Sequence, residues 1–401
     1  MANMLDYLDW RGDVPFSADP FNEADALVLA ELGYVPLEHV VPESFSVRIR
    51  LAEAEHRFDQ EAVGDFDRIY SFETDCELLH RMAQSVRFRN TQLTGYLSRT
   101  DHEELLQFSA MTCLVPDGPT VVCFRGTDHT LVGWKEDFMM SYISPVPAQE
   151  ASLDYLTRIA ALTEGPLVLT GHSKGGNLAF YAAAKAEKAV QNRLVMACSF
   201  DGPGLDDETI ASEGYAAIRP VLHAVIPNGS VVGLLMNYHP DYTVVTSTTV
   251  GLAQHDAYTW EILGGSFHEA DETTFSSQLM NETVHTWLAT SPQSQVQHFV
   301  EVLFTALEKL YPHRGAEDLK DIQLINMTEA AAYVVSLDPE SRNMLSSLLM
   351  NLFNIGKENY LQLLMRRPLD FNLGDLENML RGLQLPTHNE SDKQETDPYA
   401  D

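Results

Sequence analysis

Basic residues are scarce in this 401-residue sequence, which has 26 lysines and arginines against 58 aspartates and glutamates and a formal net charge of −32. So negative a field repels polyanions, which argues against nucleic acid as a partner and disfavours anionic lipid surfaces. The chain also lacks any apolar run of about 18 residues, the length that a membrane-spanning helix needs. Its first ten residues contain neither the basic nor the apolar segment of a secretion signal. We therefore expect a cytoplasmic protein without stable membrane insertion.

Cysteine is scarce as well, and its spacing matches neither a disulfide framework nor a metal site. A turn over residues 116–119 joins the apolar runs that carry Cys113 and Cys123. In a symmetric hairpin Cys113 would face Val122, so the two thiols would not oppose each other. We expect buried thiols in a reducing compartment, and neither a metal nor an organic cofactor. The four cysteines are Cys76, Cys113, Cys123 and Cys198.

The sequence does contain one strong motif near its centre, because Gly171-His172-Ser173-Lys174-Gly175 matches G-x-S-x-G. An apolar run over 166–170 precedes it and an alanine-rich segment over 177–188 follows it. This strand–turn–helix context is that of a nucleophile elbow, in which the serine hydroxyl projects from a sharp turn that small residues permit. The alternative is a phosphate-binding turn at a helix N-terminus, but the phosphate-loop spacing is absent. Ser173 is therefore the candidate nucleophile.

A serine hydroxyl needs a general base to become a nucleophile, and the base needs an orienting group. In α/β-hydrolases these partners follow the serine in the order acid, then histidine. His255 comes after the last predicted strand and is the candidate base. The weaker alternatives are His172 inside the motif, His223 within a strand and His239 before the last strand.

The acid must lie at the end of a strand beside the histidine loop. Asp201 ends the strand that follows the elbow unit and is the preferred candidate. It can also be read as a turn residue that bonds its own backbone. Asp241 and Asp256 are the alternatives, together with a triad completed by water or backbone.

An oxyanion hole is predicted at Arg125-Gly126-Thr127, which follows an apolar strand upstream of the elbow. A hydrolase takes one backbone N–H from such a turn and the other from the residue after the nucleophile, here Lys174. The hydroxyl of Thr127 is a further candidate donor. The alternative is an ordinary turn at the end of a strand.

Short apolar runs alternate with helical patterns over the first 270 residues, which predicts an α/β fold with a largely parallel sheet. Strands are predicted over 108–115, 120–124, 166–170, 193–200, 221–226 and 242–246. Helices are predicted over 24–32, 43–58, 73–87, 148–162, 177–188 and 230–236.

Only helical patterns remain beyond residue 270. They cover 273–289, 294–311, 328–335, 339–353 and 357–366. We expect residues 1–270 to form the α/β domain and 271–386 a helical domain or annex. Residues 387–401 are polar and poor in apolar side chains, which predicts a disordered tail.

Several of these stretches together resemble the class 3 lipase pattern of the α/β-hydrolase fold. They are Phe124-Arg125-Gly126-Thr127, Trp134, Asp137 and the motif at 171–176. Over 4–262 the chain is also similar to a bacterial family of lipase-like hydrolases of unknown function. That similarity is carried by residues 6–13, 200–204, 230–233 and 254–256.

The resemblance to class 3 lipases implies that Ser173 is the nucleophile, Thr127 the oxyanion residue and His255 the base. The sequence departs from the pattern in two places. Class 3 lipases usually carry their acid after the next strand, where residues 227–230 contain no carboxylate, and Lys174 replaces the commoner leucine.

The sequence therefore predicts an α/β-hydrolase with a mostly parallel central sheet and a helical C-terminal region. Its expected function is that of a serine hydrolase that cleaves a carboxylic ester, either a lipid or another acyl ester, through an acyl-enzyme. The alternative is a non-catalytic hydrolase-fold scaffold that binds a protein partner through its helical C-terminus.

Overall fold

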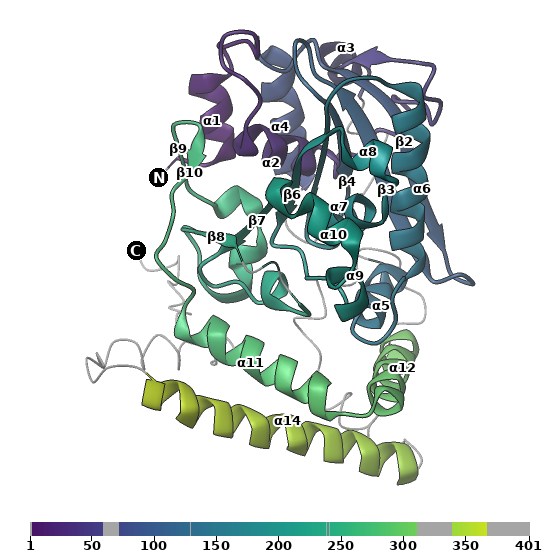
Figure 1. Ribbon diagram of the computed structural model, residues 1–401, viewed down its shortest axis with the longest axis vertical. Coiled ribbons are helices and arrows are strands. Elements are labelled where there is room, and N and C mark those ends of the chain that lie inside the picture. The colour runs from purple at the N-terminus through teal and green to yellow at the C-terminus, as the bar shows by residue number, and fades with distance from the viewer. Residues whose placement is uncertain are drawn as a thin grey trace, which may run out of the picture.

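The computed structural model describes residues 2–58, 72–128, 130–237, 239, 241–310 and 339–366. Its centre is an eight-stranded sheet in which the strands follow one another in sequence order (Figure 1). The strands β1 to β4 pair antiparallel, and β4 to β8 pair parallel. The strands of the sheet are β1 (Ile49–Arg50), β2 (Gln92–Asp101), β3 (Leu106–Leu114), β4 (Thr120–Phe124), β5 (Leu167–His172), β6 (Leu194–Phe200), β7 (Leu222–Pro227) and β8 (Tyr242–Val245).

Helices flank the sheet, and a short hairpin of β9 (Ile262–Leu263) and β10 (Ser266–Phe267) follows it. The α-helices are α1 (Met4–Arg11), α2 (Glu23–Leu32), α3 (Leu51–Arg57), α4 (Phe72–Gln84), α5 (Leu131–Met139), α6 (Pro147–Leu162), α7 (Lys174–Lys185), α8 (Lys188–Gln191), α9 (Asp207–Ile210), α10 (Glu213–Ile218), α11 (Phe275–Thr290), α12 (Gln293–Leu310) and α14 (Pro339–Arg366). The 3₁₀ turns are η1 (Arg219–Val221), η2 (Val232–Leu234), η3 (Gly251–His255) and η4 (Ala257–Thr259). None of the helices in the described part is both long and apolar enough to cross a membrane.

One face of the sheet is covered by α6, α7 and α10, which connect successive parallel strands (Figure 1). Each connection steps to the next strand in the same direction. Because such crossovers are right-handed, all three helices come to lie on the same face. Their apolar side chains form one core with Phe108, Phe124 and Leu169 of the sheet.

The opposite face is covered by the N-terminal helices α1, α2 and α4, whose apolar residues share a core with Met111, Val168 and Phe200 of the sheet. Helix α2 is buried from Ala24 to Leu32, including the acidic residues Asp25 and Glu31. Asp25 of α2 accepts bonds from the buried guanidinium of Arg87 at 2.5 and 2.7 Å, which compensates for the burial of both charges. The N-terminal segment therefore completes the second layer that a sheet buried on both faces requires.

The predicted α/β architecture with a mostly parallel sheet is confirmed, but two predicted helices are wrong and one strand was missed. Residues 43–58 do not form one helix, since β1 pairs with β2 and α3 begins only at Leu51. Strand β2 itself was not predicted, because Gly95 has a φ of 65° and the register shifts between Thr94 and Leu97, which breaks the regular alternation. The predicted helix over 230–236 is only the short turn η2.

The hairpin of β3 and β4 has a register one residue away from the expected one. Cys113 pairs with Val121, not Val122, since Leu114 and Thr120 form the last pair before the turn. Cys113 and Cys123 therefore point to the same face, with their sulfur atoms 3.9 Å apart, and both remain free thiols.

The C-terminal helices α11 and α14 lie side by side at the bottom of Figure 1. Helix α12 packs on α5, where the rings of Phe304 and Phe138 are 5.6 Å apart. The two helices predicted over 339–353 and 357–366 are one continuous helix, in which the Cβ position of Gly356 lies 3.5 Å from Thr283 of α11. The predicted helix over 328–335 and the predicted tail over 387–401 lie outside the described residues. The domain division at residue 270 stays a prediction.

Candidate active site

Ser173 lies between the end of β5 and the start of α7, in the sharp turn that the motif predicts. Its backbone has φ 56° and ψ −132°, a left-handed conformation that a residue with a Cβ adopts only under strain. The Ser173 N–H donates to the carbonyl of Phe200 at 2.9 Å, and the Ser173 carbonyl accepts from the N–H of Gly176 at 2.9 Å. These bonds to β6 and to the first turn of α7 stabilise the strained residue.

The two glycines of the motif provide room for this turn, although neither has a positive φ. A Cβ on Gly171 would lie 2.2 Å from the backbone of Gly175, and a Cβ on Gly175 would lie 2.1 Å from the carbonyl oxygen of Phe124. Helix α7 therefore starts in direct contact with β4 and β5. It begins at Lys174, three residues before the predicted start, so Ser173 immediately precedes it.

The structure brings Ser173, His255 and Asp201 into one hydrogen-bonded chain. Nε2 of His255 lies 3.0 Å from Oγ of Ser173, and Nδ1 of His255 lies 2.6 Å from Oδ2 of Asp201. The three residues come from the elbow after β5, the turn η3 after β8 and the end of β6. The His255 side chain is 14% exposed and that of Asp201 is 1% exposed. Solvent therefore reaches the hydrogen-bonded series from the side of His255 and not from the side of Asp201.

The second oxygen of Asp201 is held by donors from the loop after β7. Oδ1 of Asp201 accepts a short hydrogen bond from Oγ of Ser230 and a second one, 3.1 Å long, from the N–H of Gly233. The stretch over 227–230 contains no carboxylate. It instead supplies a donor to a carboxylate on the neighbouring strand, and the sequence reasoning missed this role of Ser230.

The other two candidate acids lie elsewhere. Asp241 is exposed and pairs with Arg219 at 2.9 Å, and this contact lowers the pKa of its carboxyl. Asp256 caps η4 by accepting from the N–H of Tyr258 at 3.1 Å. Neither contact involves His255.

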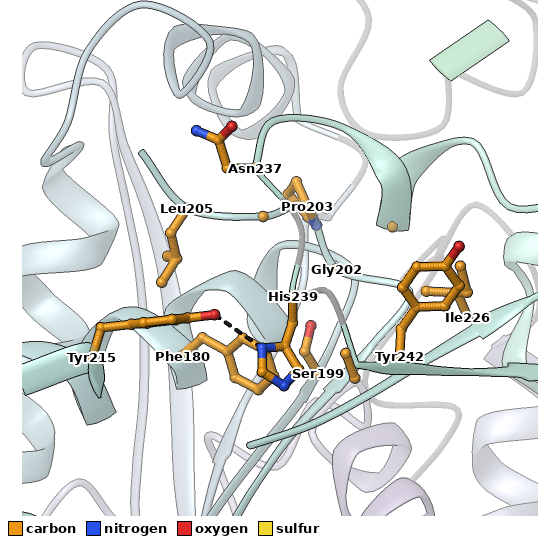
Figure 2. A pocket seen from close by; sticks show the side chains of 13 residues that line it. Phe180, Ser199, Gly202, Pro203, Leu205, Tyr215, Ile226, Asn237, His239 and Tyr242 are labelled. Carbon is orange, nitrogen blue, oxygen red and sulfur yellow. Dashed lines mark hydrogen bonds between the residues drawn. The ribbon is translucent and has the colours of Figure 1, made fainter. Parts of the chain in front are cut away.

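The alternative histidines have other partners too. His223 forms a short contact with Glu23 of α2. His239 lies 2.9 Å from the Tyr215 hydroxyl and lines a small pocket over β6 and β7, shown in Figure 2. Burial lowers the pKa of His239, and the pocket has room for about one water molecule. His172 points its Nε2 at the carbonyl oxygen of His255, 2.8 Å away.

The predicted oxyanion residues lie next to the nucleophile. Lys174 is the first residue of α7, so its N–H is among those that have no partner within the helix and it lies at the positive end of the helix dipole. The turn after β4 is close, because a Cβ on Gly126 would lie 3.0 Å from the Cβ of Ser173. The hydroxyl of Thr127, the next residue, donates a short hydrogen bond to Oδ2 of Asp137.

The side chain of Lys174 runs inward and ends in a buried cluster of charges. Its Nζ donates to the carbonyl of Gln107 at 2.9 Å and to Oε2 of Glu136 at 3.0 Å, and lies 3.7 Å from Oδ1 of Asp137. Burial raises the pKa of Asp137 to about 6, against the opposing effect of the Lys174 charge. The Asp137 side chain is 32% exposed, but its Oδ1 atom is buried. The charge of the buried Lys174 is thus balanced by Glu136.

No group of three or more metal-binding side chains occurs among the residues that the structure describes. The chemical groups of the candidate site are a serine, a histidine, carboxylates and backbone amides. Such a set is suited to acyl transfer by a nucleophilic serine.

The mostly parallel sheet, the helices on both faces and the strained serine elbow define an α/β-hydrolase fold of the lipase-like kind. The chain belongs to the Mbeg1-like family, whose model matches residues 82–305 and so includes the elbow and both of its partners. Among solved structures it is similar to one described as the crystal structure of M37 lipase, with 14% identity, a TM-score of 0.34, and coverage of 54% of this chain and 71% of that one. No curated protein matches the sequence.

Proposed function

We propose that this protein is a serine hydrolase that cleaves a carboxylic ester, with Ser173 as nucleophile, His255 as general base and Asp201 as the orienting acid. The observation that carries the proposal is the continuous chain of contacts from Asp201 through His255 to Ser173. Each contact is within the range of a hydrogen bond, and each nitrogen of the imidazole faces the partner that its role requires.

In the proposed mechanism, Oγ of Ser173 attacks the acyl carbon while Nε2 of His255 takes the hydroxyl proton. Asp201 accepts from the Nδ1–H, which holds the tautomer that leaves Nε2 free as a base and stabilises the imidazolium. The imidazolium then gives its proton to the departing alcohol, and the acyl group stays on Ser173. A water molecule, deprotonated by His255, releases the acid and restores the serine.

The negative charge on the carbonyl oxygen is assigned to an oxyanion hole formed by the N–H groups of Lys174 and Thr127. The start of α7 at Lys174 supports this assignment, since a helix N-terminus stabilises negative charge. The short distance between Gly126 and Ser173 supports the assignment of Thr127, the residue that follows Gly126. The role of Thr127 also follows from the class 3 lipase pattern that this turn resembles.

The proposed substrate class is a lipid or another acyl ester, in agreement with the lipase-like family. The proposal needs no metal and no organic cofactor. A net charge of −32 favours neutral substrates over anionic ones. We propose further that the protein acts in the cytoplasm on substrate presented to it, without stable insertion into a membrane.

A fluorophosphonate probe tests the proposal directly, because it reacts with an activated serine. We expect stoichiometric labelling of the wild-type protein at Ser173, found by peptide mass spectrometry, and no labelling of Ser173→Ala. Ser98→Ala, which removes an exposed serine of β2, is the control and should label normally. A folded wild-type protein that does not react would favour the non-catalytic scaffold instead.

A further inference from the structure

We propose that His172 and its two buried neighbours, Glu31 and Tyr34, form a positioning unit that holds the His255 loop through a main-chain carbonyl. The inference rests on the proposed function, since it assigns residues that position its general base. It makes the N-terminal segment, which precedes the matched range of 82–305, a part of the active site.

The first contact of the unit joins His172 to the backbone of His255. Nε2 of His172 lies 2.8 Å from the carbonyl oxygen of His255, and the two rings are 4.7 Å apart at an angle of 35°. A carbonyl oxygen only accepts hydrogen bonds, so Nε2 of His172 is protonated and donates. The loop is thus held by a directed bond to its backbone and by contact between the rings.

The second nitrogen of His172 faces the N-terminal segment. Nδ1 lies 3.2 Å from the hydroxyl of Tyr34 and 3.2 Å from Oε1 of Glu31. All three side chains are buried, with exposures of 2% for His172, 4% for Tyr34 and 0% for Glu31. When Nδ1 is unprotonated it accepts from Tyr34, and when it is protonated it faces the Glu31 carboxylate at ion-pair distance. The ring has a partner at both nitrogens in either state, which fixes its plane.

The position of His172 in the chain explains why its bond to the His255 carbonyl controls the placement of the His255 imidazole. His172 is the last residue of β5 and directly precedes Ser173. His255 therefore makes two contacts with adjacent residues of one strand end: its Nε2 meets Ser173, and its carbonyl oxygen meets His172. Two contacts to consecutive residues set both the distance and the direction of the imidazole relative to the nucleophile.

The rest of the loop is anchored separately. Nε1 of Trp260 donates to the carbonyl oxygen of Gln254 at 2.7 Å, and the Gln254 side chain accepts from the N–H of Gly229 at 2.8 Å. The Trp260 bond comes from within the same stretch of chain, and the Gly229 bond leads to the loop after β7. The His172 bond joins the loop to the last residue of the strand that leads to the nucleophile.

A pair of substitutions at one position separates positioning from packing. Glutamine places its amide nitrogen near the Nε2 position of histidine and can donate to the His255 carbonyl, whereas asparagine places its amide near Nδ1 and cannot reach that carbonyl. We expect His172→Gln to keep most of the wild-type kcat. We expect His172→Asn to lose about 10–100-fold in kcat with little change in KM, as is typical when a supporting hydrogen bond is removed from a site.

The N-terminal members of the unit are tested by Glu31→Gln and Tyr34→Phe, which preserve shape, and by the double variant. We expect each to lower kcat and the fluorophosphonate labelling rate, and the double variant to lower them further, while KM stays near the wild-type value. Leu29→Ala is the control, because Leu29 is buried on α2 but points to a different side from Glu31. It should lower thermal stability and leave the kcat of the folded enzyme unchanged.

The outcomes distinguish this inference from the proposed function. If the wild-type protein does not label at Ser173, the proposed function fails. If the wild-type labels and a folded His172→Asn reacts at the same rate as His172→Gln, the positioning role is overturned and the hydrolase stands. Should His172→Asn fail to fold, the double variant at Glu31 and Tyr34 decides, and an unchanged kcat there overturns the inference.

Discussion

Lys174 and Glu136 form an ion pair inside the protein, with Nζ and Oε2 3.0 Å apart and side-chain exposures of 1% and 0%. Glu136 also accepts from the N–H groups of Gln107 and Ala148 at 3.1 and 2.8 Å. The carboxylate therefore joins β3, α5 and the start of α6 to the first residue of α7, directly behind the proposed oxyanion hole.

Breaking this pair should be costly. Lys174→Met leaves Glu136 buried without its counter-ion, and we expect the free energy of unfolding to fall by about 3–5 kcal/mol. The double variant Lys174→Met/Glu136→Gln removes both charges and should recover much of the loss. Urea unfolding measures both changes. Arg219→Met, which breaks an exposed pair with Asp241, is the control and should change stability little.

Ser173→Gly should show that the elbow stores strain. Glycine adopts a φ of 56° without a steric penalty, so we expect this variant to be inactive and more stable than Ser173→Ala by about 1 kcal/mol. Denaturant unfolding of the two variants gives the difference. Equal stability of the two would mean that the backbone at Ser173 is not strained.

Asp201→Asn should keep the fold and lower kcat by up to about 10⁴-fold, because the amide favours the wrong tautomer of His255. Steady-state ester hydrolysis measures the loss. Asp241→Asn and Asp256→Asn serve as controls and should retain near-normal turnover, since Asp241 pairs with Arg219 and Asp256 caps η4. Near-normal turnover of Asp201→Asn would remove Asp201 from the mechanism.

Ser230→Ala should weaken the support of the acid without removing it. Oδ1 of Asp201 loses the hydroxyl donor but keeps the N–H of Gly233. We expect kcat to fall by roughly 10–100-fold and the fold to persist. Ser230→Thr, which retains the hydroxyl, is the matched comparison. Equal kinetics of the alanine and threonine variants would show that the hydroxyl is not needed.

Asp137 should make stability depend on pH in a defined direction. Burial raises the pKa of its carboxyl from 3.8 to about 6 in the folded protein. The folded state therefore binds the proton more tightly than the unfolded state. The contribution of this group to stability is full below pH 3.8 and is lost as the pH rises through about 6.

The variant Asp137→Asn removes this titration. The unfolding free energy of the wild type, relative to that of Asp137→Asn, should therefore fall as the pH rises from 4 to 7. Urea unfolding at a series of pH values measures this difference. A constant difference across that range would contradict the raised pKa.

The elbow and the alternation of strands and helices that follows it could be predicted from the sequence because both depend on contiguous residues. The motif, the apolar run before it and the helical segment after it lie within about two dozen residues, and their local preferences agree with the final fold. The same applies to α2, predicted over 24–32, because its N-cap Asn22 accepts locally from the N–H of Asp25 at 3.1 Å.

Predictions failed where distant parts of the chain override local preference. Residues 49 and 50 join the sheet because β2 is there to pair with them, and β2 contains a glycine and a register shift that conceal its alternation. The helix α14 continues past Gly356 because packing on α11 offsets the low helix propensity of glycine. These effects depend on contacts that no local pattern contains.

The sequence by itself determined the fold class, the nucleophile elbow and a short set of candidate partners, because spacing along the chain limits which residues can follow each strand. Only the tertiary structure decided which candidates meet. Asp201 contacts His255 across 54 residues of sequence, and Ser230 contacts Asp201 from the loop after the next strand. Glu31 contacts His172 from α2, which covers the face of the sheet opposite α7. Hydrogen bonds act over about 3 Å and depend on direction, so they are set by the packing of strands and helices and not by distance along the chain.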